Sequence, residues 1–149
     1  MNRRNFIKNG CVACLAMSAL PLVVSSCATL TNTTGKIIKD GISLSTDDFI
    51  IKEKGSNDYR SFLIVRNELL KFPICVFRFD DKKFAALWMQ CTHQGAELQA
   101  SGDYLQCPAH GSEFNNKGQV TNGPASTNLR TFPVTVNDKE LFIDLRKQS

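Results

Sequence analysis

Two short segments carry the decisive pattern of this chain: CTHQGAEL at residues 91–98 and CPAHGSEF at residues 107–114. In each segment a cysteine is followed within three residues by a histidine and then by a glycine. Thiolates and imidazoles are good metal ligands, so two such loops can bring two cysteines and two histidines to one site. The residue types alone allow either a tetrahedral zinc ion or an iron–sulfur cluster with mixed ligands.

The order of the ligands favours a cluster over zinc. Structural zinc sites usually pair a C-x₂₋₄-C segment with an H-x₃₋₅-H segment, so that like ligands are neighbours in the sequence. Here each segment supplies one cysteine and one histidine, Cys91 with His93 and Cys107 with His110. A [2Fe–2S] cluster needs two ligands on each iron, and two matched loops can give both cysteines to one iron and both histidines to the other.

The two segments resemble the cluster-binding boxes of the Rieske [2Fe–2S] protein family, C-T-H-x-G and C-P-x-H-G-S. The resemblance extends to NGPA at residues 122–125, followed by Leu129 and by FPV at residues 132–134, which is similar to the proline loop and closing strand of that family. It covers roughly residues 72–145, most of the chain after the N-terminal segment.

The resemblance implies a site for one [2Fe–2S] cluster. Cys91 and Cys107 would bind the buried iron, and His93 and His110 would bind the outer iron near the surface, where electrons enter and leave. Ser112 would donate a hydrogen bond to a sulfide of the cluster. Hydrogen bonds to sulfur stabilise the more negative reduced cluster and so raise its reduction potential.

The chain departs from the high-potential members of the family at three positions. Those members carry a disulfide between the two loops, and its cysteines would fall at Ala96 and Ala109. They also place a tyrosine where this chain has Phe114, so one hydroxyl donor is absent. We therefore expect packing and the proline loop to hold the two loops together. We also expect a reduction potential near the middle of the Rieske range of about −150 to +300 mV.

The rest of the chain predicts a small all-β domain, an antiparallel sandwich or barrel. Short apolar runs are separated by turn signals, and no convincing helical pattern follows the N-terminal segment. The predicted strands are Phe49–Lys52, Phe62–Arg66, Ile74–Phe79, Phe84–Trp88, Val134–Val136 and Leu141–Leu145. Residues 90–128 break this rhythm and are rich in glycine, proline, serine and asparagine, so we expect a long functional loop region there.

The N-terminus predicts export. Residues 1–26 have a basic start, MNRRNFIK, which resembles a twin-arginine export motif, and then an apolar run. VSSC at residues 24–27 resembles a bacterial lipobox, which predicts lipidation of Cys27 and attachment to the membrane on the periplasmic side. The alternative is an N-terminal span that is retained as an anchor. We expect a tether over residues 27–40 and a Rieske domain over residues 41–149, with its cluster-binding part at about 89–128.

The other cysteines and the charge have simpler interpretations. Cys11 and Cys14 lie in the apolar export segment and are expected to be discarded with it, whereas Cys75 lies in a strand-like run as a buried free thiol. The net charge of +4 arises mostly from Arg3, Arg4 and Lys8, and without residues 1–26 it is about +1. The basic balance therefore does not indicate binding to nucleic acid.

These observations predict an electron-transfer protein rather than an enzyme. The chain has two histidines in all, so none is left for the mononuclear iron that a Rieske oxygenase needs. The first hypothesis is a one-electron carrier that works with a redox partner protein. The alternatives are a Rieske subunit of a membrane quinol-oxidising or oxyanion-oxidising complex, and a zinc-bound or cluster-free binding module.

Overall fold

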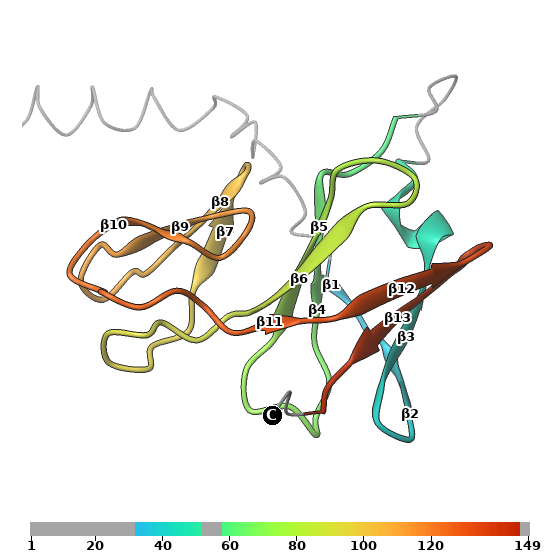
Figure 1. Ribbon diagram of the computed structural model, residues 1–149, viewed down its shortest axis with the longest axis horizontal. Coiled ribbons are helices and arrows are strands. Elements are labelled where there is room, and N and C mark those ends of the chain that lie inside the picture. The colour runs from blue at the N-terminus through green and yellow to red at the C-terminus, as the bar shows by residue number, and fades with distance from the viewer. Residues whose placement is uncertain (1–31, 52–57, 147–149) are drawn as a thin grey trace, which may run out of the picture.

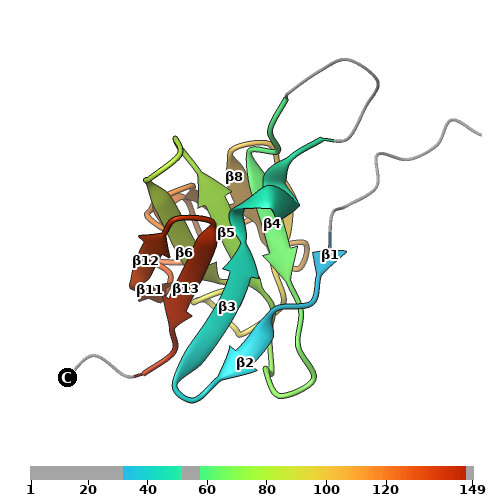
Figure 2. The same cartoon turned by 90° about the vertical axis from the view of Figure 1, so that its right-hand side faces the viewer.

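The computed structural model describes residues 32–51 and 58–146, and the regular structure in these residues is short β-strands with one 3₁₀ helix (Figure 1). The predicted all-β class is confirmed. The strands make three sheets, and a five-stranded sheet lies between the other two (Figure 1, Figure 2). In the described part of the chain, no helix has the length and apolarity needed to cross a membrane.

The middle sheet has the strand order β1–β4–β5–β6–β11. Its strands are β1 (Asn32–Thr33), β4 (Phe62–Val65), β5 (Ile74–Arg78), β6 (Phe84–Trp88) and β11 (Thr131–Phe132). All neighbours are antiparallel except β1, which runs parallel to β4. Strands β4, β5 and β6 are consecutive in the chain and form a meander.

A second sheet covers one face of the middle sheet. Its order is β12 (Val134–Asn137), β13 (Glu140–Asp144), β3 (Gly41–Ser45) and β2 (Lys36–Ile38), all antiparallel. A 3₁₀ helix, η1 (Thr46–Phe49), follows β3.

A third sheet lies on the other side of the middle sheet, at the left of Figure 1. It contains β10 (Val120–Asn122), β9 (Glu113–Asn115), β8 (Tyr104–Gln106) and β7 (Gln99–Ser101) in that order, again antiparallel. We call this sheet and its loops, residues 89–129, the cluster lobe.

The middle sheet is buried on both faces, because successive side chains of a strand point to opposite sides. In β5, Ile74 and Val76 pack toward the second sheet, whereas Cys75 and Phe77 pack toward the cluster lobe. All four side chains are almost completely buried. Burial on both sides explains why this strand is apolar at every position instead of alternating.

Most of the predicted strands are present, and one is wrong. Five of the six predictions correspond to β4, β5, β6, β12 and β13. The predicted strand at residues 49–52 is not formed in its described part, because Phe49 ends η1 (Thr46–Phe49) and Ile50 makes only an isolated bridge to Tyr59. The Ser45 hydroxyl accepts a hydrogen bond from the Asp47 N–H, and the Asp48 carboxylate accepts one from the Ser45 N–H. This capping box favours a helical turn at these residues.

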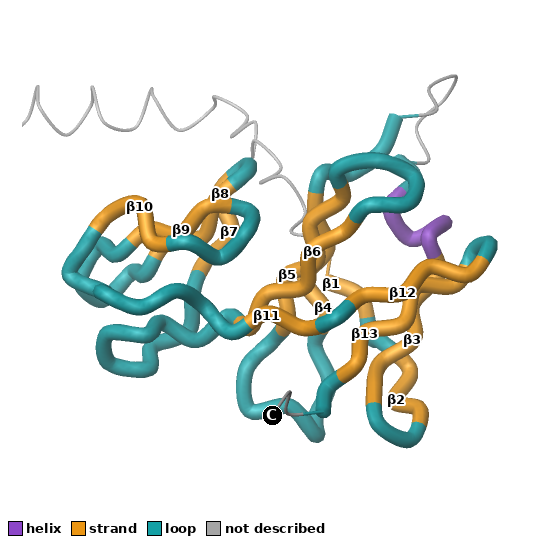
Figure 3. Tube along the Cα trace, viewed as in Figure 1, coloured by secondary structure: helices purple, strands orange, loops and turns teal. Residues whose placement is uncertain are grey.

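Two further expectations need correction. Residues 90–128 do not form one long loop, since they contain β7–β10 as well as the predicted loops (Figure 3). The predicted tether over residues 27–40 extends too far, because Asn32–Thr33 and Lys36–Ile38 pair with β4 and β3. The predicted export motif, Cys11, Cys14 and Cys27 all lie outside the described residues, so export and lipidation stay predictions.

Candidate metal centre

Three loops meet at one end of the cluster lobe and bring the predicted ligands together. The loop between β6 and β7 carries Cys91 and His93, and the loop between β8 and β9 carries Cys107 and His110. The third loop, taken here as residues 121–129 with the last two residues of β10, leads from β10 toward β11 and contains the predicted proline segment. We call residues 89–96, 106–112 and 121–129 the loop tip.

The two ligand loops have the same backbone geometry. In the first, the Gly95 N–H donates to the Cys91 carbonyl at 2.9 Å, and the Cys91 N–H donates to the Ala96 carbonyl at 2.8 Å. In the second, the Gly111 N–H donates to the Cys107 carbonyl at 3.0 Å, and the Cys107 N–H donates to the Ser112 carbonyl at 2.8 Å. The two turns are thus closed by equivalent bonds.

A glycine closes each turn because the backbone there is left-handed. Gly95 has φ +77° and Gly111 has φ +78°, a conformation that a side chain disfavours. The matching glycines in CTHQG and CPAHG therefore have a conformational reason, and the cysteine and the glycine occupy equivalent positions in the two loops.

The structure places like donors together. Cys91 and Cys107 come from different loops, and each is 2% exposed. His93 and His110 are exposed, and their ring centroids are 5.0 Å apart with nearly perpendicular rings. In the described residues, no group of three or more His, Cys, Asp and Glu side chains is arranged to hold a single metal ion.

The surroundings of Cys107 suit a thiolate ligand. Burial acts to raise the pKa of the Cys107 thiol, but hydrogen bonds from the backbone N–H groups of Ala109 and His110, and one with Cys91, lower it below its ordinary value. Backbone N–H groups that point at a sulfur stabilise its anionic form. Cys75 differs, because burial alone raises the pKa of its thiol far above the usual range and keeps it neutral.

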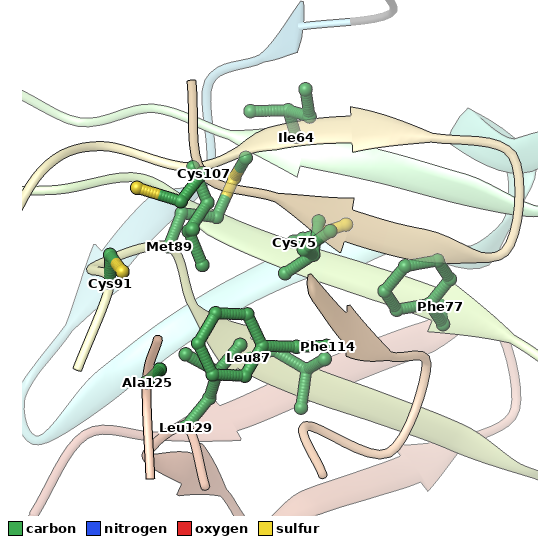
Figure 4. Packing of buried hydrophobic residues seen from close by; sticks show 12 residues of the cluster. Ile64, Cys75, Phe77, Leu87, Met89, Cys91, Cys107, Phe114, Ala125 and Leu129 are labelled. Atoms are coloured by element: carbon green, nitrogen blue, oxygen red, sulfur yellow. The ribbon is translucent and has the colours of Figure 1, made fainter. Parts of the chain in front are cut away.

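The packing under the site is apolar. Cys91, Cys107 and Met89 gather at one side of a buried cluster that includes Leu87 and Phe114, away from Phe77 (Figure 4). Phe114, at the position of the missing tyrosine, is fully buried. The cysteine side of the site is thus shielded from water, whereas the histidine side faces it.

The third loop is bonded to both ligand loops. The Thr92 hydroxyl donates to the Thr127 carbonyl at 2.6 Å. The Ala125 N–H donates to the Ser112 hydroxyl at 3.0 Å, and the Asn122 side-chain amide donates to the Gly111 carbonyl at 3.3 Å. Ser112 is fully buried at this junction. Residues 121–129 therefore connect the two ligand loops to each other.

Sequence reasoning named Ser112 and four candidate ligands, whose roles stay predictions, but it missed Thr92 and Asn122 as structural contacts. Thr92 lies inside the first box, so its position was visible. Its partner Thr127 is 35 residues away, and no local pattern predicts that pairing.

The comparisons with known proteins match this region. The Rieske [2Fe-2S] domain family model matches residues 52–133, more than half of the chain. The oxygenase component of dicamba O-demethylase from Stenotrophomonas maltophilia is 36% identical over 85 residues, 50% of this chain and 25% of that protein. The cytochrome b6-f complex iron-sulfur subunit 1 from Synechocystis is 40% identical over 55 residues, 36% of this chain and 31% of that protein. The matched segment therefore spans a third or less of each relative.

A solved structure gives the same picture. The cyanobacterial plasma membrane Rieske protein PetC3 from Synechocystis aligns with a TM-score of 0.50 and 26% identity, over 56% of this chain and 86% of that one. The Rieske monooxygenase CntA aligns with a TM-score of 0.55 over 74% of this chain and 33% of that one. Its 15% identity supports the shared fold alone.

Proposed function

Because the chain belongs to the family of Rieske [2Fe-2S] domains, whose members bind one [2Fe–2S] cluster, we propose that it is a one-electron carrier. When bound, the cluster takes up and releases one electron at a time. The observation that carries the proposal is the pairing of donors, a buried cysteine pair beside an exposed histidine pair.

The proposed ligands follow from this pairing. Cys91 and Cys107 would bind the iron that faces the apolar packing, and His93 and His110 would bind the iron that faces solvent. Tunnelling between proteins needs a short path, and two exposed imidazoles provide one. The buried side of the site excludes water from the cysteine sulfurs.

The proposed location is the outer face of the cytoplasmic membrane or the periplasm. The support is the sequence of residues 1–27, with its paired arginines, apolar run and terminal VSSC. PetC3, which shares this fold, is described as a plasma membrane protein. We propose that a lipid on Cys27 anchors the chain, with a retained N-terminal span as the alternative.

A second candidate function is a subunit of a membrane oxidoreductase complex. The similarity to iron-sulfur subunits of cytochrome b6-f complexes, such as that of Synechocystis, favours it. Some relatives are oxygenase components, but this chain has only His93 and His110, so an oxygenase iron site within it is not proposed.

The test of the carrier function is electron paramagnetic resonance of the anaerobically purified, dithionite-reduced full chain, with iron and zinc counted in parallel. We expect two irons per chain and a rhombic signal with the low average g value that histidine ligation produces. Stoichiometric zinc with no signal would reject electron transfer and support the binding-module alternative. Two irons with the signal of a four-cysteine cluster would reject histidine ligation.

Replacing Ser112 with alanine is expected to lower the reduction potential while the cluster stays bound. The Ser112 hydroxyl accepts from Ala125, so its own proton can be donated to a cluster sulfur. If that bond is about 1.4 kcal/mol stronger in the reduced state, its loss lowers the potential by about 60 mV. Redox titration of wild type and Ser112→Ala checks this, with iron content and the resonance signal as controls. An unchanged potential combined with a lower melting temperature would show that the serine is only structural.

A further inference from the structure

The surface beside the first ligand loop is hollowed by a recess of about 560 Å³. This volume lies within the range of about 300 to 1,000 Å³ that is typical of pockets for small molecules. The recess is lined by Trp88, residues 90–95, Thr127 and Arg130. Its lining thus combines a tryptophan and an arginine with neutral hydrogen-bonding groups.

Arg130 supplies the positive charge of the recess and is held in place by the body of the protein. Its guanidinium carbon lies 4.5 Å from the centre of the Phe132 ring, and its Nη2 donates to the Leu145 carbonyl at 3.0 Å. The Arg130 carbonyl accepts a hydrogen bond from the Trp88 N–H at 2.9 Å, so the backbone fixes the arginine and the tryptophan next to each other. A guanidinium has five N–H donors, and the bond to Leu145 uses one of them.

No acidic side chain of the described residues neutralises Arg130. None of the ion pairs within residues 32–51 and 58–146 includes it. The lining of the recess contains no aspartate or glutamate, and Glu97, which follows the first ligand loop, is paired with Arg66 at 2.5 Å. An arginine with free donors and no acidic neighbour is suited to bind an anion.

Trp88 gives the recess an aromatic wall. Its ring makes edge contacts with Phe72 and Phe132, with centroid distances of 5.9 and 5.8 Å. Its Nε1–H donates to the side-chain oxygen of Gln90 at 3.0 Å, so the Gln90 NH₂ group remains as a donor. An indole that is fixed in this way can pack against the apolar part of a ligand.

We propose that this recess binds a small organic acid, whose carboxylate pairs with the Arg130 guanidinium and whose apolar part packs against the Trp88 indole. Guanidinium and carboxylate groups match in shape and can form two parallel hydrogen bonds, which a neutral molecule of the same shape cannot reproduce. The proposed binding goes beyond electron transfer, because Arg130 and Trp88 are not candidate cluster ligands.

Benzoate and benzamide are a matched pair of probes, because they share a ring and nearly the same shape but only benzoate is charged. Binding of each to the detergent-purified full-length holoprotein is measured by isothermal titration calorimetry at fixed ionic strength, with a detergent blank subtracted. We expect benzoate to bind with a dissociation constant on the order of 1 mM, a usual affinity for a ligand of this size. Benzamide is expected to bind at least about tenfold more weakly, since the loss of a charged hydrogen-bonded pair costs that much.

Three variants locate the binding. Arg130→Gln removes the positive charge and is expected to weaken benzoate binding about tenfold or more. Gln94→Glu keeps every contact of Arg130 but adds a carboxylate to the exposed lining, and it is expected to weaken benzoate binding several-fold without changing benzamide binding. Lys82→Gln removes one positive charge at the β5–β6 hairpin, at the opposite end of β6 from Trp88, and is expected to bind benzoate like wild type.

The position of the recess beside His93 gives a second readout, which rests on the proposed carrier function. A bound anion favours the oxidised and more positive state of the site, so the oxidised protein is expected to bind benzoate more tightly than the reduced protein. A difference of about fivefold in affinity corresponds to a reduction potential about 40 mV lower at saturation, because a tenfold change is about 59 mV for one electron. Redox titration with benzoate and with benzamide measures this shift.

The outcomes separate this inference from the carrier function. Equal binding of benzoate and benzamide, wild-type affinity in Arg130→Gln, or the absence of saturable benzoate binding would each overturn the organic-acid site. Any of these results in a protein with a normal cluster signal would leave the carrier function intact. Selective benzoate binding by a protein without a cluster signal would reject the carrier function and support the site. Selective binding with an unchanged potential would overturn the coupling between the site and the cluster.

Discussion

Replacing Cys107 with serine is expected to reduce the iron content per chain more than about tenfold. A change in the surroundings of a metal ligand alone typically costs 10-fold to 100-fold in affinity, and loss of the ligand itself costs at least as much. Serine is also a harder and far less acidic ligand than cysteine. Iron content and visible absorbance of anaerobically purified protein measure the effect.

Cys75 offers a matched control, because it is another buried cysteine in the same apolar cluster. Its raised pKa and its position in β5 identify it as a neutral packing thiol, so Cys75→Ala is expected to retain full iron content. Equal iron loss in the two variants would mean that Cys107 acts through folding rather than ligation.

His110 gives a second and independent variant. His110→Cys keeps a metal-binding side chain at the same place, so we expect the cluster to persist with a lower reduction potential. Its resonance signal is expected to change toward that of a four-cysteine cluster. A wild-type signal in His110→Cys would exclude His110 as a ligand.

The second large effect is expected from Thr92→Val, which removes the hydroxyl that bonds the first ligand loop to the third loop. A hydrogen bond of about 1 kcal/mol corresponds to about a fivefold change in an opening equilibrium. We therefore expect the cluster to be lost about five times faster. Adding Asn122→Ala, which breaks the bond to the second ligand loop, is expected to raise this to roughly 25-fold if the contributions add. The decay of visible absorbance under a chelator measures both rates.

Two controls distinguish this hydrogen bond from a general loss of stability. Thr92→Ser keeps the hydroxyl and is expected to decay like wild type. Thr121→Val makes the same chemical change at an exposed position of the third loop and is expected to have no effect. Equal decay of Thr121→Val and Thr92→Val would contradict the role assigned to Thr92.

An engineered disulfide tests the same idea from the other direction. Cysteines placed at Ala96 and Ala109 would introduce the link that the resemblance implies for the high-potential members of the family. If the third loop substitutes for that link, the disulfide is expected to suppress the effect of Thr92→Val in oxidised protein and not after reduction of the disulfide.

The candidate site was far easier to predict from the sequence than the complete fold. The candidate ligands follow from local information, because each box contains its cysteine, histidine and glycine within five residues. The left-handed turns at Gly95 and Gly111 are also local, since the glycine itself supplies the conformation. Strands β4, β5 and β6 were predictable because their apolar runs are bounded by clear turns.

The errors occurred where long-range pairing determines the structure. Strands β7–β10 have three residues each, too few for a periodic pattern, and they form strands only because they pair with one another. The polar character of Asn32–Thr33 indicates a flexible tether, yet these two residues form β1 and pair with β4. The apolar run at residues 49–51 indicates a strand, but Phe49 instead ends η1, which the capping box of Ser45 and Asp48 favours.

The pairing of β6 with β11 has a consequence for how this architecture can change. The Trp88 N–H donates to the Arg130 carbonyl at 2.9 Å, so the cluster lobe leaves and rejoins the middle sheet at two hydrogen-bonded residues. Segments with adjacent ends are the ones that proteins tolerate as insertions, because the host sheet closes in the same way whatever lies between them. The cluster lobe thus occupies the position of an insertion in a β-sandwich. It can gain or lose length between its two boxes, at the β7–β8 hairpin, without altering the register of its host.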